Sequence, residues 1–124
     1  IRVPFDQESR RIEVRFPDAA ANPYLAFAAL MMAGLDGIAN KIDPGSACED
    51  DFFNMPFERQ KKFPTVARSL GEALVSLQAD HEFLCQGGVF TKDFIESYID
   101  LKTKEVNRLR CTTHPVEFEL YWSC

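Results

Sequence analysis

Two arginines and a glutamate stand at alternate positions near the start of the sequence, in the pattern Arg11-x-Glu13-x-Arg15, with Arg2 and Arg10 nearby. Guanidinium groups grip phosphate and carboxylate oxygens at two points. A glutamate oxygen suits a hard cation such as Mg²⁺, which also binds phosphates. The pattern favours a site for a polyphosphate and an anionic substrate. The ordinary alternative is a surface ladder of exposed ion pairs, and spacing alone leaves it open.

A second pair of candidate ligands is weaker. His81 and Cys85 stand four residues apart, which would place both on one helix face. No other His or Cys has usable spacing, so we expect a capped turn and a buried thiol. The cysteines show no C-x-x-C pair and no signal peptide precedes them, which predicts reduced cytosolic thiols at Cys48, Cys85, Cys111 and Cys124.

The elements that position the Arg-Glu-Arg pattern can be read from periodicity. Residues 10–16 alternate apolar and charged side chains, which predicts a strand with one charged face. Asn22 and Pro23 predict the start of a helix over residues 24–41. That helix is apolar on nearly every side, so we expect it to be buried all round, by more protein than this chain contains. Residues 43–64 break the pattern and predict an irregular loop.

The second half of the chain predicts further helices. Ser69 with Glu72 forms a capping box, Asp80 can cap a short turn, and Thr91 can cap a long amphipathic helix to about residue 110. The segment 114–124 is rich in aromatic residues and is expected to dock on its own chain or on a neighbour.

Length and composition bound the function. The chain has 124 residues, a mass of 14.1 kDa and a net charge of −5. This indicates one domain or a piece of one, and it argues against nucleic-acid binding. No apolar run is long enough for a membrane span. The sequence begins with Ile1 rather than Met, which suggests a piece of a longer protein.

Two stretches, RRIEVRFPD (10–18) and ANPYLAFAA (21–29), are similar to segments of a known protein family. With the segments 32–38, 87–91 and 114–121, they resemble the C-terminal portion of bacterial type I glutamine synthetase. The resemblance implies an α+β, mainly α piece of the catalytic domain, with about four helical segments and one or two strands belonging to a larger sheet. Residues 1–124 would form the C-terminal part of that domain.

The resemblance also implies a chemistry. The family uses ATP to phosphorylate the side-chain carboxylate of glutamate, and ammonia displaces the phosphate, with Mg²⁺ or Mn²⁺ as cofactor. Glu13 matches a metal ligand. Arg15 matches an arginine beside the transferred phosphoryl group and the substrate glutamate, so it is the catalytic candidate. Arg11 and Arg2 match arginines on the ATP side. The isolated chain is expected to be inactive, because most of the site lies elsewhere.

Partners and regulation follow in the same way. The resemblance implies other synthetase subunits as partners, a cytoplasmic homo-dodecamer, an assembly tail at 114–124 and a regulatory-type loop at 43–64. Phe53 stands where relatives carry a modifiable tyrosine. Two alternatives stay open: a free-standing, non-catalytic module that binds synthetase subunits, and a fragment of a related ligase that joins glutamate to another amine.

Overall fold

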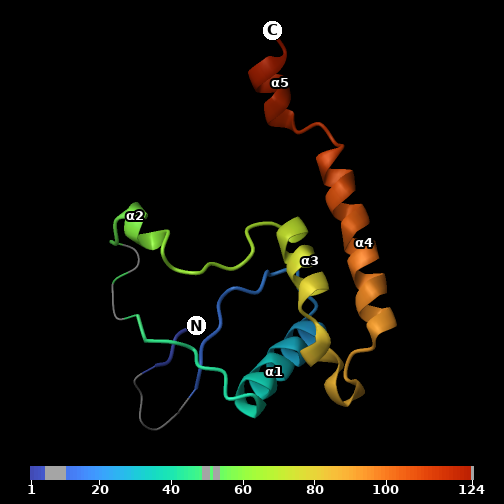
Figure 1. The fold of residues 1–124 in the computed structure, drawn as a ribbon. Coiled ribbons are helices and arrows are strands. Elements are labelled where there is room, and N and C mark those ends of the chain that lie inside the picture. Colours follow the sequence, from blue (N-terminus) through green and yellow to red (C-terminus); the bar gives the residue numbers. More distant parts are fainter. Residues whose placement is uncertain (5–10, 49–50, 52–53, 124) are drawn as a thin grey trace. The chain divides into compact units, whose positions relative to one another are not determined.

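The computed structural model describes residues 1–4, 11–48, 51 and 54–123. It divides into two compact units, Ile1–Val66 and Ala67–Cys124, each described by itself below. The described residues form five α-helices and one 3-10 helix (Figure 1). No helix in this part of the chain has both the length and the apolarity that crossing a membrane requires.

Helix α1 (Pro23–Ala39) of the first unit begins where the sequence predicts. The Asn22 side-chain oxygen accepts hydrogen bonds from the backbone N–H groups of Tyr24 (3.0 Å) and Leu25 (3.4 Å), and Pro23 occupies the first turn. Met32 is the single buried residue of the helix. Within this chain the helix is therefore not buried all round, and its large apolar side chains lie exposed: Tyr24, Phe27, Met31, Leu35 and Ile38.

The strand predicted over residues 10–16 does not form in the described part of the chain. Glu13 makes one isolated antiparallel bridge with Arg2, and residue 10 lies outside the described residues. A strand needs a row of backbone partners, and here only one opposed residue supplies them. Alternation indicates an extended segment, but a sheet requires backbone partners that the described residues do not present.

The expected loop 43–64 contains a short helix, α2 (Phe57–Gln60). The Gln60 side-chain amide donates to the Met55 carbonyl oxygen (2.7 Å), and Met55 is buried. Lys61 pairs with Glu58 at 2.8 Å. This part of the loop is thus locally ordered. The expectation at Phe53 concerns a residue outside those that the structure describes.

The second unit is a pair of packed helices, α3 (Leu70–Ala79) and α4 (Lys92–Arg110), joined through the 3-10 segment η1 (Glu82–Gly88). Ser69 and Thr91 cap α3 and α4 as predicted, each accepting a backbone N–H at 3.2 Å. The reciprocal half of the predicted capping box is wrong, because Glu72 accepts from the backbone N–H of Arg68 (2.8 Å) and not from that of Ser69. The expected cap of the short turn is wrong, because Asp80 ends α3 and His81 precedes η1. The core consists of buried apolar side chains: Leu74, Leu84, Phe90 and Ile95.

The terminal segment contains a fifth helix, α5 (Pro115–Tyr121). His114 caps it: its Nδ1 accepts from Val116 N–H (3.2 Å), and its own N–H donates to Glu117 (3.0 Å). The aromatic rings of Phe118 and Trp122 lie 5.7 Å apart between centroids, and both side chains are exposed.

Candidate functional site

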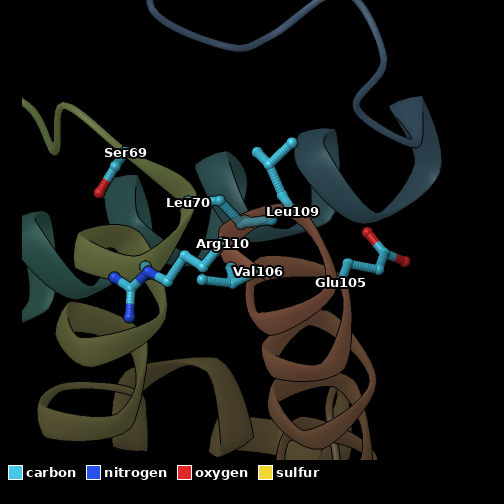
Figure 2. A pocket seen from close by; sticks show the side chains of 7 residues that line it. Ser69, Leu70, Glu105, Val106, Leu109 and Arg110 are labelled. Atoms are coloured by element: carbon cyan, nitrogen blue, oxygen red, sulfur yellow. The ribbon is translucent and has the colours of Figure 1, made fainter. Parts of the chain in front are cut away.

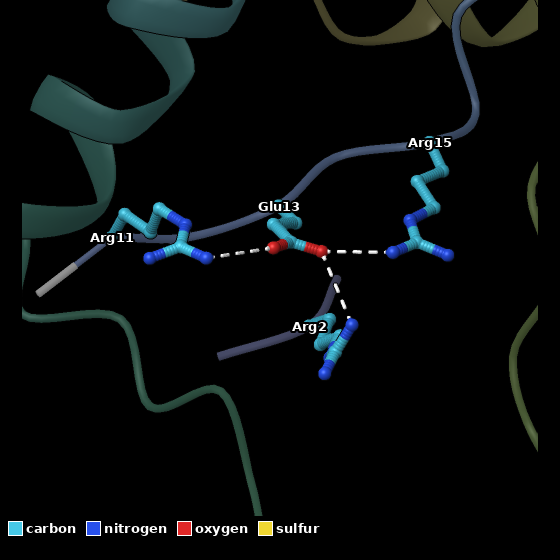
Figure 3. Close-up of polar contacts among 4 residues, drawn as sticks. All are labelled: Arg2, Arg11, Glu13 and Arg15. Carbon is cyan, nitrogen blue, oxygen red and sulfur yellow. Dashed lines mark hydrogen bonds and ion pairs between the residues drawn. The ribbon is translucent and has the colours of Figure 1, made fainter. Parts of the chain in front are cut away.

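The backbone bridge between Arg2 and Glu13 gathers the charged residues of the first unit. Each residue donates its N–H to the carbonyl oxygen of the other, at 3.0 Å and 2.7 Å. Directly opposed residues of an antiparallel pair project side chains to the same face. Alternate residues of an extended segment also share a face, which adds Arg11 and Arg15 to it. All three guanidinium groups therefore converge on the Glu13 carboxylate (Figure 3).

Both oxygens of Glu13 are engaged. Arg15 donates to Oε2 at 2.9 Å, and Arg2 lies 3.5 Å from the same oxygen. Arg11 reaches Oε1 at 3.4 Å. The Glu13 side chain is 24% exposed, whereas that of Arg15 is 73% exposed. The guanidinium groups therefore still face solvent, where an oxyanion can reach them. We call Arg2, Arg11, Glu13 and Arg15 the arginine cluster.

The arginine cluster lowers the pKa of Glu13. The main cause is the hydrogen bond from Arg15, which stabilises the ionised carboxylate, while desolvation opposes it. The positive charges of Arg2, Arg15 and Arg11 add to the lowering of the pKa. The carboxylate is consequently ionised at neutral pH. Three positive charges and one negative charge leave the cluster with a net charge of +2, which suits a phosphate or carboxylate ligand.

The donor set fits a divalent cation only in part. Glu13 offers the hard oxygen that Mg²⁺ or Mn²⁺ prefers. Among the described residues, no group of three or more His, Cys, Asp or Glu side chains comes together to hold a metal ion. Glu13 can thus supply one ligand, and other ligands would have to come from other parts of a complete site.

The remaining candidates do not form a second centre. The His81 ring nitrogen Nδ1 lies 3.0 Å from the Leu77 carbonyl oxygen, which explains this histidine as a turn residue. Cys48, Cys85 and Cys111 are free thiols, and Cys124 lies outside the described residues.

One feature of the second unit was not predicted from sequence. A cavity of about 320 Å³ lies between the start of α3 and the end of α4 (Figure 2). Its lining residues are Ser69, Leu70, Gly71, Glu105, Val106, Leu109 and Arg110. Gly71 lies close to the Arg110 side chain: a Cβ there would lie 3.1 Å from the guanidinium, which is the flexible end of that side chain. The small residues at the start of α3 were the available signal.

Comparison with known proteins identifies the family of this chain. The family model described as glutamine synthetase, catalytic domain, matches residues 1–121. The chain is 60% identical to the glutamine synthetase of Azorhizobium caulinodans over an alignment that covers 98% of this chain and 26% of that protein. It is 60% identical to the Vibrio cholerae glutamine synthetase and 58% identical to that of Salmonella typhimurium, covering 99% of this chain and 27% of each relative.

These matches run through the whole described structure, from the arginine cluster to α5. The chain spans about a quarter of the length of the curated relatives it matches. The resemblance noted from the sequence is thereby confirmed: this chain belongs to the glutamine synthetase catalytic-domain family.

Proposed function

We propose that the chain works as part of a glutamine synthetase, which ligates ammonia to glutamate at the expense of ATP through a γ-glutamyl phosphate. The observation that carries the proposal is the convergence of three arginines on Glu13 within a chain about 60% identical to glutamine synthetases. Phosphoryl transfer needs little from a protein beyond positioning and positive charge around the phosphoryl group. The arginine cluster provides both.

Each residue of the cluster has a proposed role. Arg15, the most exposed of the three arginines at 73%, binds the transferred phosphoryl group and the substrate glutamate. Arg2 and Arg11, which also contact Glu13, bind ATP. Glu13 is one ligand of a Mg²⁺ or Mn²⁺ ion. When bound, that ion would neutralise phosphate charge and polarise the phosphoryl oxygens.

The other ligands, and the cover of α1, would come from the rest of the synthetase. Apolar side chains such as Phe27 (70% exposed) and Ile38 (77% exposed) leave the helix uncovered within this chain. Burying such surface is worth about 25 cal/mol per Å², so a partner surface over α1 would stabilise the complete protein. We therefore propose that the isolated chain has no synthetase activity.

Assembly and regulation complete the proposal. The exposed aromatic side chains of residues 114–124 would anchor one synthetase subunit in another, within a cytoplasmic homo-dodecamer. Residues 43–64 would be the regulatory-type loop, and residues 10–16 the active-site segment of the catalytic domain. Modification of a tyrosine could not operate at position 53, where the sequence has phenylalanine.

The test is to recover the native polypeptide with an antibody raised against residues 92–110. We expect a band several times 14.1 kDa on a denaturing gel. The recovered protein should form glutamine from glutamate, ammonia, ATP and Mg²⁺. A band near 14 kDa without activity would instead favour the free-standing module. A large polypeptide that uses another amine in place of ammonia would favour the related ligase.

A further inference from the structure

A histidine holds the start of α5. His114 Nδ1 accepts the backbone N–H of Val116 at 3.2 Å, and the Glu117 carboxylate accepts the backbone N–H of His114 at 3.0 Å. The two hydrogen bonds form a reciprocal capping box. Helix α5 has 7 residues, and isolated helices shorter than about 12 residues are marginal in water. The stability of α5 therefore depends strongly on this cap.

The cap is open to solvent. Residues 111–123 are all exposed, so no element of the described structure covers His114. The charged groups nearest to His114 along the chain lie on two helices: Glu117 and Glu119 on α5, and Arg108 and Arg110 at the end of α4. The imidazole can thus exchange protons with water.

Protonation of His114 removes the cap. Nδ1 can accept the Val116 N–H only in the neutral ring with its proton on Nε2, and histidine side chains change charge between about pH 8 and pH 5. An imidazolium at this position also faces the positive end of the helix dipole. The Glu117 carboxylate attracts the imidazolium, but exposed ion pairs are weak. Loss of the cap and repulsion by the dipole therefore outweigh this attraction, and acid destabilises α5.

We propose that His114 is a pH-sensitive switch for α5, whose neutral form stabilises the helix and whose protonated form does not. The exposed rings of Phe118 and Trp122 stand one helical turn apart, with centroids separated by 5.7 Å. The switch therefore controls whether the chain displays this aromatic pair on one helix face. The proposal rests on the geometry of the cap and goes beyond the proposed function.

The first experiment follows the ¹³Cα shifts of residues 115–121 in the 124-residue chain by NMR, from pH 8 to pH 5 at constant ionic strength. We expect the ratio of unfolded to folded α5 to rise about fivefold in acid, the factor that a typical N-cap contributes. The control H114N keeps an oxygen acceptor at the cap that does not titrate, so its ratio should stay constant. A constant ratio in the wild-type chain, or an equal rise in H114N, would overturn the proposal. So would a loss of α5 that accompanies loss of the signals of buried Ile95, because the change would then be global unfolding.

The second experiment asks whether the switch belongs to His114 or to Glu117. The variant E117Q keeps an oxygen acceptor for the His114 N–H and removes the negative charge. We expect E117Q to lose α5 in acid at least as strongly as the wild-type chain, because the attraction for the imidazolium is gone. Trp122 is the only tryptophan of the sequence and reports the same change by near-UV circular dichroism. A pH-independent α5 in E117Q would assign the switch to Glu117 and overturn the proposal.

Discussion

Truncation of Ile95 to alanine tests the packing of the second unit. Ile95 lies in α4 and is 2% exposed, the most buried of the core side chains. The substitution removes three carbon atoms. At about 0.8 kcal/mol for each buried methylene-sized group, the lost transfer free energy is about 2.4 kcal/mol. The cavity left behind raises the expected loss of unfolding free energy to about 3 kcal/mol.

That loss is large for this unit. A domain of roughly 60 residues has a total unfolding free energy of about 3–9 kcal/mol. Urea unfolding followed by circular dichroism at 222 nm measures the change. The matched control is Leu101→Ala on the same helix, where the side chain is 56% exposed and the expected loss is below about 1 kcal/mol. Equal losses for the two variants would refute the assignment of Ile95 to the core.

Three further predictions concern the site and the helix ends. Because its pKa is lowered, ionised Glu13 stabilises the fold at pH values above its ordinary pKa of 4.5, and this stability is lost as the pH falls through the lowered pKa. A ¹³C titration of its carboxyl carbon should give a pKa below 4.5, and Arg15→Ala should return that pKa toward 4.5. Asn22→Ala should cost about 1 kcal/mol of α1 stability, measured by amide hydrogen exchange over residues 24–27, whereas unchanged exchange would contradict the cap. Gly71→Ala should raise the free energy of urea unfolding by about 0.5 kcal/mol, because alanine favours the helix and the flexible end of Arg110 can move away from the new Cβ. A lower free energy of unfolding would show that Arg110 cannot move away.

Helix starts were predictable because their causes are local. The Asn22 and Ser69 side chains accept hydrogen bonds from backbone N–H groups two or three residues away, and such signals lie within a short window of sequence. The error at Asp80 is of the same local kind. Two helical segments meet there, and the same residue that could start one ends the other.

The strand and the site could be predicted only in part, because their causes are not local. Alternation over 10–16 specifies an extended segment, but the backbone partner of Glu13 is Arg2, eleven positions away. Spacing predicted that Arg11, Glu13 and Arg15 share a face. The contact of Arg2 with Glu13 joins residues far apart in the sequence, and composition and periodicity do not predict such a pairing. The cavity beside Gly71 likewise requires knowing that α3 packs on α4.

The most direct test of the central claim is the activity of the proposed longer synthetase polypeptide carrying Glu13→Ala, compared with Glu96→Ala as the control for charge. Metal-dependent glutamine formation and the size of the assembly are measured on the same preparations. We predict that Glu13→Ala abolishes turnover and leaves the assembly intact, while Glu96→Ala retains both. Unchanged turnover in the Glu13→Ala protein would contradict the role assigned to the arginine cluster.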